Sequence, residues 1–300
     1  MSKDPRFQAC RAHLDQRQRL IFEEPDGLSS ALKTGFFALK IPTDLDLTPI
    51  IKFSKEFYLD PLPNQQRENA KYRGYRDKPS LYFDREHFQT EHILANANQR
   101  ASALPLAVQY TSNRMHKLAA CILRNILDNL GIARHLWPLV TADTCSGGGV
   151  KWLAVSHYRP EREMPGAPAH KDTGFVTILY CDQPGLQAKL SDNWVDVQPP
   201  NGYFLINFGG SLELLTSRLK SPVTAVIHKV TQCTVNATKI DRHSFAAFLN
   251  PPATGTLYSI TPDGNNAEPI LPVETFLRTF NAETWKDQHS NFGISTASTY

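Results

Sequence analysis

Two histidines and an aspartate stand in an order that could bind a metal ion. His170 and Asp172 are separated by one residue, and His228 follows much later in the chain. Side chains two residues apart on a strand point to the same side, so His170 and Asp172 could reach one ion. Two histidines and one carboxylate form the facial triad that holds Fe(II) in non-haem oxygenases and leaves coordination positions open. We therefore predict a metal site of His170, Asp172 and His228.

A second pair of residues follows the triad. Arg242 and Ser244 also alternate by two, at the start of an apolar segment. An arginine and a hydroxyl on one strand face could hold the far carboxylate of a 2-oxo acid by charge-assisted hydrogen bonds. Each feature alone is weak, because an isolated His-x-Asp is usually a surface pair and a histidine in an apolar strand is usually a hydrogen-bonded core residue. Their order along the chain favours a metal and cosubstrate site.

The elements expected to position these residues are short strands. After the glycine-rich segment 146–149, candidate strands separated by turns occupy 150–158, 175–180, 186–190, 194–197, 203–208, 223–230 and 244–249. Many short strands at regular spacing indicate a sandwich or barrel, and a jelly roll is the version with a ligand-filled mouth. The predicted fold is mainly β with flanking helices: a double-stranded β-helix, or cupin-like jelly roll.

Helices are predicted on both sides of this core. We predict that residues 1–30 are helical at first and then form a turn. Further helices are predicted at 47–58, which is amphipathic, at 105–130, where the periodicity is strongest, and at 272–286, as a closing helix. We expect one oxygenase domain over residues 1–300. It would comprise a helical N-terminal part with a lid (1–145), a jelly-roll core with the metal site (146–255), and a C-terminal helix and tail (256–300).

Composition narrows the class of partner and the compartment. The net charge of +3 is spread along the 300 residues without a basic run, so no nucleic-acid partner is expected. The five cysteines are odd in number and lack CxxC spacing, which favours reduced thiols in the cytoplasm. No apolar stretch approaches the length of a membrane span, and the N-terminus has no apolar targeting segment. We expect a small-molecule substrate and no membrane partner. The sequence does not predict an oligomeric state.

Several segments around these residues resemble a known family. Residues 150–251 are similar to the C-terminal core of isopenicillin N synthase-like 2-oxoglutarate/Fe(II)-dependent dioxygenases. The matching segments are 156–160, 169–172, 184–187, 193–197, 203–209, 212–216, 242–244 and 248–251, with 34–37 at the family's N-terminal entry strand. The resemblance is strong in the core and weak over 40–145.

The resemblance implies roles for individual residues. His170, Asp172 and His228 would bind iron, and Arg242, Ser244 and Tyr158 would bind 2-oxoglutarate; no catalytic residue is expected beyond the metal centre. The substrate would contact Arg73, Tyr75, Thr173 and Ala247. Two departures from the family pattern stand out: Gly210 replaces a carboxylate and Ala247 replaces an aromatic ring. If Ala247 faces the pocket, its small side chain makes the pocket larger. The helix at 272–286 would close the mouth of the pocket.

The resemblance also implies a reaction. An oxidoreductase of this family would use Fe(II), 2-oxoglutarate and O₂ to hydroxylate, desaturate or cyclise a small organic compound, as in secondary metabolism, and would release succinate and CO₂. An Fe(II) oxidase of the isopenicillin N synthase type, which uses no 2-oxoglutarate, is the nearest alternative. A catalytically inactive metal-binding module and a zinc hydrolase are alternatives of other classes, although zinc sites of that type usually show a helical histidine pair.

Overall fold

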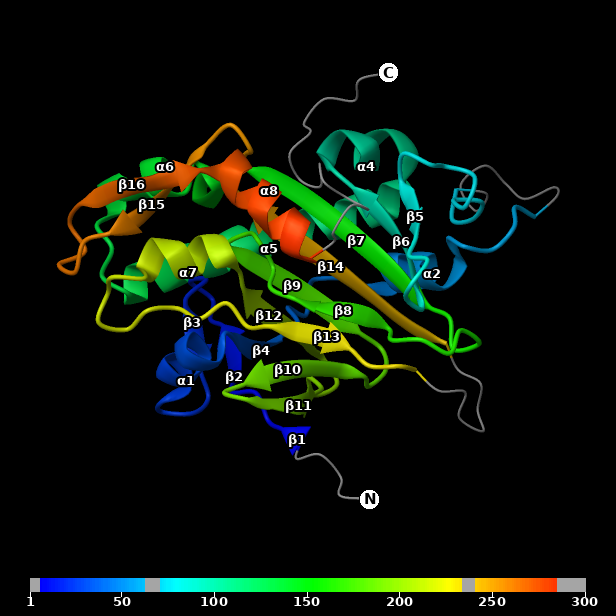
Figure 1. The fold of residues 1–300 in the computed structure, drawn as a ribbon, viewed down its shortest axis with the longest axis horizontal. Helices are drawn as coiled ribbons and strands as arrows, with labels where there is room; N and C mark the ends of the chain where they lie inside the picture. Colours follow the sequence, from blue (N-terminus) through cyan, green and yellow to red (C-terminus); the bar gives the residue numbers. More distant parts are fainter. Residues whose placement is uncertain (1–5, 63–70, 234–240, 285–300) are drawn as a thin grey trace.

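Two β-sheets face each other across the centre of the molecule (Figure 1). The computed structural model describes residues 6–62, 71–233 and 241–284. The large sheet has the strand order β3 (Leu20–Phe22), β2 (Arg11–Leu14), β4 (Phe36–Lys40), β12 (Tyr203–Phe208), β9 (Val176–Cys181), β14 (Arg242–Asn250), β7 (Val150–Tyr158), β6 (Thr90–Ala95) and β5 (Tyr82–Asp84). The small sheet has the order β1 (Arg6–Phe7), β11 (Asn193–Val197), β10 (Leu186–Leu190), β13 (His228–Val230) and β8 (Ala167–His170). The predicted jelly roll is confirmed.

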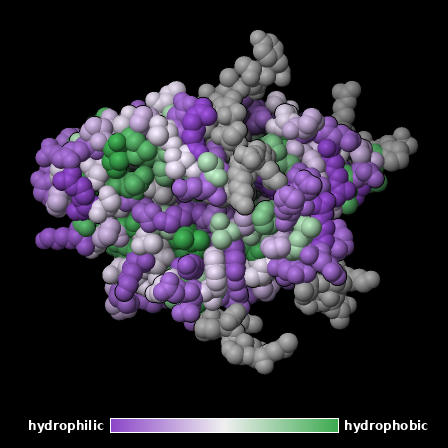
Figure 2. All heavy atoms as spheres, in the orientation of Figure 1, coloured by the Kyte–Doolittle hydropathy of each residue, from purple (hydrophilic) through white to green (hydrophobic). Residues whose placement is uncertain are grey.

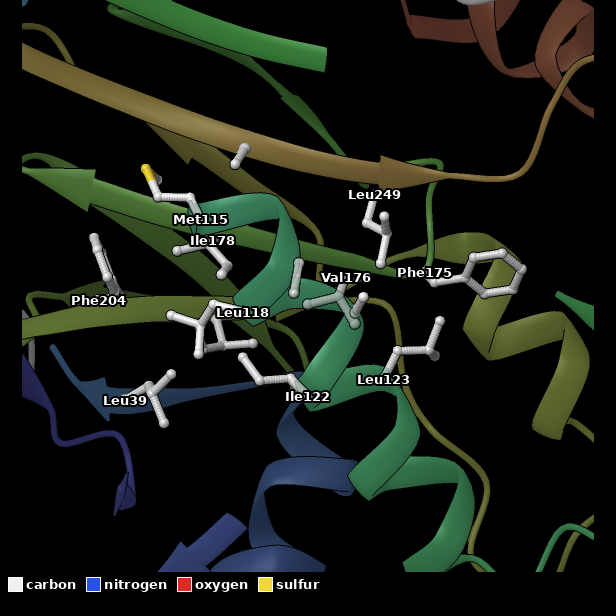
Figure 3. Packing of buried hydrophobic residues seen from close by; sticks show 14 of the residues in the cluster. Leu39, Met115, Leu118, Ile122, Leu123, Phe175, Val176, Ile178, Phe204 and Leu249 are labelled. Atoms are coloured by element: carbon white, nitrogen blue, oxygen red, sulfur yellow. The ribbon is translucent and has the colours of Figure 1, made fainter. Parts of the chain in front are cut away.

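The outer face of the large sheet is covered by the long helix α5 (Leu106–Asn129). Its buried residues include Met115, Leu118, Ile122 and Leu123, and these point toward the strands in Figure 3. Val176 and Ile178 of β9 lie opposite them in the same buried cluster. The helical periodicity of 105–130 therefore reflects a real amphipathic helix, which fixes the strands that carry the site.

The N-terminal region differs from its prediction. Residues 6–22 form β1, β2 and β3, and the only helix described before residue 35 is α1 (Gly27–Thr34). β2 pairs in parallel with β4 and antiparallel with β3, and this pairing buries Ala12 and Leu20 in the core. The helical reading of 1–30 was wrong because strand pairing with a distant segment overrode local propensity. Strands β1 to β6 all precede residue 146, so this region supplies both sheets as well as helices.

Five further helices complete the described part of the chain. They are α2 (Thr48–Glu56), α4 (Ala97–Ala103), α6 (Trp137–Val140), α7 (Gly210–Thr216) and α8 (Val273–Thr284), with short 3₁₀ turns at Arg134–Leu136 and Thr144–Ser146. One of them, α2, packs beside α5 against β14 and β7. β15 (Thr256–Ile260) and β16 (Ala267–Pro272) form a separate hairpin. Val273 and Leu277 of α8 pack against Ala253 and Leu257. A closing helix was predicted at 272–286; the described part ends at Thr284, and 285–286 lie outside the described residues.

The surface carries few large apolar side chains. The face in Figure 2 is mostly hydrophilic, with apolar residues in separate patches. Among the described residues, no helix has the length and apolarity needed to cross a membrane. All five cysteines are free thiols, which agrees with the pattern read from the sequence.

Candidate metal centre and cavity

The structure brings the three predicted ligands together. His170 ends β8, His228 begins β13, and the two residues are directly paired across these antiparallel strands. Asp172 follows two residues later. Its Oδ1 lies 4.0 Å from Nε2 of His170 and 3.8 Å from Nε2 of His228. Two atoms each bonded to one ion at about 2.1 Å can be at most about 4.2 Å apart. Both separations satisfy this limit, and all three ligand atoms lie within 4.8 Å of one another, so they could hold one ion.

The histidine rings are oriented as metal ligands are. Nδ1 of His170 lies 2.9 Å from the carbonyl oxygen of Pro168, and Nδ1 of His228 lies 3.2 Å from that of Val226. Because a carbonyl can only accept, each Nδ1 carries the proton, which leaves the lone pair on Nε2. Burial, and then the neighbouring His228, lower the pKa of His170 to about 4, so its ring is neutral at neutral pH. The donor set thus fits a divalent cation.

The backbone around Asp172 is held by the start of α7. The amide of Gly210 donates to the carbonyl oxygen of Asp172 at 2.8 Å. A Cβ at Gly209 would lie 2.2 Å from the carbonyl oxygen of Gly174, so only glycine permits this close approach. The side-chain amide of Asn207 lies 3.5 Å from Oδ2 of Asp172. These contacts hold the backbone of Asp172 and one of its carboxylate oxygens.

A cavity between the two sheets opens onto the triad. β14 pairs with β7 so that Arg242 faces Tyr158 and Ser244 faces Ser156. These four residues point inward together with Ala246 and Phe248, while the histidines of the small sheet line the opposite wall. The alternation expected of Arg242 and Ser244 is confirmed, and they share the cavity with the metal triad.

Arg242 has a buried donor directed at no protein group. Its side chain is 2% exposed, its Nε donates to the carbonyl of Pro184 at 3.0 Å, and its Nη1 has no hydrogen-bond partner among the described residues. Its guanidinium carbon lies 4.4 Å from the centre of the Tyr158 ring, and the Tyr158 hydroxyl lies 3.4 Å from Oγ of Ser244. A buried unsatisfied donor beside two hydroxyls is suited to a carboxylate ligand.

Two predicted substrate residues lie outside this cavity. Tyr75 is fully buried in the hydrophobic core, and its hydroxyl lies 2.7 Å from the carbonyl oxygens of Lys71 and Ala103. Arg73 is oriented toward Glu56, with Nε 3.7 Å from Oε2, and donates to the carbonyl of Asp60. Neither lines the cavity. Their assignment to the pocket wall was wrong, because the turn that carries them packs against α2 and α4.

The other two predicted substrate residues are also misplaced. Ala247 is fully buried and faces the core between Leu153 and Ile178, because it alternates with the cavity residues Ala246 and Phe248. Thr173 lies in a separate small pocket, and its carbonyl accepts from the Ser211 hydroxyl at 2.7 Å. Ala247 therefore does not widen the cavity. No residue in the described part of α8 lines the cavity either, so the structure gives no support to a lid role for α8.

Two cavity residues were missed from the sequence. Arg85 follows β5 and His92 lies on β6; both line the cavity beside the triad. The alternation Thr90, His92, Leu94 marks one face of β6, and all three residues face the cavity. This period-two pattern is visible in the sequence, but the position of β6 next to β7 is a tertiary feature.

A second group of histidines and an aspartate lies on the opposite face of β7 and β14. His157, Asp241 and His243 have ligand-type atoms within 4.8 Å of one another. Here, however, each ring nitrogen already has a polar partner: His157 contacts Glu91 at 2.8 Å and Asp241 at 3.0 Å, and His243 contacts Asp182 at 3.2 Å and the Tyr58 hydroxyl at 3.3 Å. We call these six residues the outer network.

Comparison with known proteins agrees with this geometry. The model of the 2OG-Fe(II) oxygenase superfamily matches residues 151–251. That segment contains the triad, Arg242, Ser244 and Tyr158. This segment of the chain is thus similar to the 2OG-Fe(II) oxygenase superfamily. Iron and 2-oxoglutarate are the cofactors that give the superfamily its description.

Curated relatives match over part of their length. A 1-aminocyclopropane-1-carboxylate oxidase of Persea americana is 31% identical over 153 residues, which is 49% of this chain and 45% of the relative. One from Prunus mume is 28% identical over 239 residues, or 75% of this chain and 72% of the relative. In the first alignment the chain thus spans about half the length of the plant enzyme.

Solved structures share the fold at low identity. The crystal structure of JOX2 in complex with 2OG, Fe and JA superposes with a TM-score of 0.66 at 19% identity, covering 98% of this chain and 91% of JOX2. The dioxygenase for auxin oxidation in rice gives a TM-score of 0.64 at 18% identity, covering 95% of this chain and 99% of the rice protein. These similarities support the fold and not a particular substrate.

Proposed function

We propose that this protein is a non-haem Fe(II)- and 2-oxoglutarate-dependent oxygenase that hydroxylates, desaturates or cyclises a small organic compound, of the kind found in secondary metabolism. The observation that supports this best is the shared cavity. It contains two histidines with Nε2 lone pairs, the Asp172 carboxylate, and the buried unsatisfied Nη1 of Arg242. When bound, Fe(II) supplies the activation of O₂, and oxidation of 2-oxoglutarate to succinate and CO₂ supplies electrons.

Each group of residues has a separate task in this proposal. His170, Asp172 and His228 hold the metal from one wall of the cavity. Arg242 donates to the distal carboxylate of 2-oxoglutarate from the other wall, with Ser244 and Tyr158 beside it. The planar guanidinium suits this task, since its fork matches a carboxylate. Asp172, His228 and Arg242 are buried, and burial strengthens charged contacts.

The test is a succinate assay. Protein loaded anaerobically with Fe(II) and 2-oxoglutarate is exposed to O₂, and succinate and oxygen consumption are measured over time. The proposal expects slow succinate release even without the main substrate, and none from His228→Ala. The isopenicillin N synthase-type alternative expects no succinate from iron-loaded protein. An inactive metal-binding module would bind iron but consume no oxygen beyond a metal-only control.

A further inference from the structure

The cavity contains a buried amide at the end opposite Arg242. Asn207 of β12 is 2% exposed and is paired with Thr177 of β9, which is paired in turn with Phe248 of β14 (Figure 1). Residues directly opposite one another in a sheet point to the same face, and all three line the cavity, so they form one row across its wall. At about 3.4 Å per residue, this row lies roughly 20 Å from Arg242 along β14.

The orientation of this amide follows from its neighbour Asp172. Nδ2 of Asn207 lies 3.5 Å from Oδ2 of Asp172. Because an ionised carboxylate can only accept, the NH₂ group of Asn207 faces Asp172 and its Oδ1 faces away. This Oδ1 is buried and has no hydrogen-bond partner among the described residues. Buried polar groups nearly always have a partner, so we expect a ligand in the cavity to donate to it.

The ligands of the proposed reaction cannot supply this hydrogen bond. Ionised 2-oxoglutarate and succinate carry only acceptor oxygens, and O₂ and CO₂ carry no hydrogen. A water molecule can donate to Oδ1 before the substrate binds, but a substrate that displaces it loses affinity unless it makes the same hydrogen bond. The donor that Asn207 requires in the filled cavity is therefore a group of the substrate.

We infer that the substrate is a small, mainly apolar compound with a hydroxyl or N–H group that donates to Oδ1 of Asn207. Since Nδ2 of the same amide faces Asp172, this hydrogen bond holds the substrate close to the metal centre. The adjoining wall is apolar, with Ala246, Leu179 and Ala154 in the next row, and would contact the apolar body. This inference rests on the proposed function, because it assumes that Fe(II) and 2-oxoglutarate fill the rest of the cavity.

The test compares each donor with a compound of similar shape that lacks it. Anaerobic protein loaded with Fe(II) and 2-oxoglutarate is titrated with 2-phenylethanol and 2-phenylethyl fluoride, which tests a hydroxyl. Indole and benzofuran test an N–H group in the same way. We expect at least one donor to bind more tightly than its isostere by roughly 2- to 10-fold, the range given by a neutral hydrogen bond. Both compounds of a pair are measured on the same protein, so a general loss of stability or iron cancels in their affinity ratio.

Substitutions assign this preference to one side chain. Asn207→Ala and Asn207→Leu both lack the acceptor, and the affinity ratio should fall to about 1 in each. Asn250→Ala is the matched control, because Asn250 ends β14, its Oδ1 also has no partner among the described residues, and it does not line the cavity. This control and Thr177→Val, which removes the neighbouring hydroxyl, should keep the preference. A crystal structure of wild-type protein with the tighter-binding donor should place that donor within about 3.2 Å of Oδ1 of Asn207, which tests the inference even if neither Asn207 variant folds.

The outcomes separate this inference from the proposed function. If wild-type protein releases no succinate, the proposed function fails and this inference falls with it. If succinate is released but neither donor binds more tightly than its isostere, the donor site is overturned alone. It is also overturned if folded Asn207 variants keep the preference, or if water remains on Oδ1 of Asn207 in the complex.

Discussion

Two groups of histidine and aspartate, one in the cavity beside β8 and β13 and one on the outer face of β7 and β14, differ in one respect. In the cavity group, His170 and His228 each donate through Nδ1 to a backbone carbonyl, and each Nε2 lies 3.8–4.0 Å from Asp172, too far for a hydrogen bond. In the outer network both nitrogens of His157 and of His243 lie within 3.3 Å of a polar partner. Proximity alone therefore does not make a metal site; the ring must be anchored through Nδ1 so that Nε2 faces the carboxylate across an ion-sized gap.

The outer network is held by electrostatics within the protein. Burial acts to raise the pKa of Glu91, but hydrogen bonds from His157, Arg76 and Tyr82 outweigh it and hold the pKa well below its usual range. The ring of Tyr58 stacks on His157 with 3.7 Å between centroids. Such a network stabilises the packing of β6, β7 and β14 and so positions the cavity face indirectly.

Loss of one ligand should give the largest effect. We expect His228→Ala to abolish stoichiometric Fe(II) binding and succinate release, because two ligands remain where a facial site needs three. His157→Ala, on the opposite face, should keep iron binding while lowering the free energy of unfolding by roughly 1–3 kcal/mol through lost buried hydrogen bonds. Iron content after anaerobic loading and urea denaturation measure the two effects. If His228→Ala bound iron normally, or if folded His157→Ala lost its iron, the assignment of the metal site to the cavity histidines would be contradicted.

Removing the cavity guanidinium should weaken cosubstrate binding. Arg242→Leu should raise the Kd for 2-oxoglutarate by roughly 10- to 100-fold, since a charge-assisted hydrogen bond contributes about 1.5–3 kcal/mol. Ser244→Ala should have a smaller effect, of roughly 0.5–1.5 kcal/mol. Titration of the iron-loaded protein under nitrogen measures both. If Arg242→Leu bound 2-oxoglutarate with unchanged affinity, Arg242 would not be its binding residue, and the oxidase alternative would be favoured.

Two adjacent alanines on β14 point to opposite faces of the strand, one to the cavity and one to the core, and the same substitution at each tests this orientation. Ala247→Phe should destabilise the fold by about 1–3 kcal/mol, because the ring would overpack the core between Leu153 and Ile178. Ala246→Phe should instead fill the cavity and slow turnover, with iron binding retained. Urea denaturation and the succinate assay distinguish the two. If Ala247→Phe blocked turnover at normal stability, Ala247 would face the cavity and not the core.

The smallest effect concerns a third buried histidine. His116 lies between the carbonyl oxygens of Ser112 (2.8 Å) and Trp152 (3.0 Å). The two carbonyl contacts raise the pKa of His116, but burial, and then the charge of Arg100, outweigh them and lower it to about 3. Between pH 6.5 and 3 the unfolded chain binds a proton here that the folded protein does not. Stability should therefore fall as pH falls below about 6.5, by at most about 1.4 kcal/mol per pH unit from this residue.

A matched variant isolates this contribution. His170, whose pKa is also lowered, changes stability in the same direction over the same range. Glu91, with its lowered pKa, matters only below about pH 4.3, where its unfolded form takes up a proton. His116→Gln should therefore flatten the pH dependence between 6.5 and 5 without removing it. An unchanged slope would show that His116 is protonated in the folded protein.

The sequence predicted that His170, Asp172 and His228 lie together. It also predicted the inward face of β14, because that face depends on period-two alternation within one strand. It failed where packing between distant segments decides the outcome. Tyr75 entered the core through contacts to Lys71 and Ala103, and residues 6–22 became strands by pairing with β4 and β11. Ala247 could have been placed correctly, since its odd number puts it on the face opposite Arg242. Arg85 could not, because its hairpin reaches the cavity only through pairing with β7.

The glycine contacts at the start of α7 have a consequence for metal supply. Gly210 donates to the carbonyl oxygen of Asp172, and Gly209 permits the close approach of the neighbouring backbone, so contacts within the protein hold the backbone of this ligand. A rigid set of two imidazoles and one carboxylate binds several first-row ions, and their affinities do not favour iron. Which ion occupies the site in a cell is then decided by the pool of available metals, and cobalt, nickel or zinc would act as competitive inhibitors.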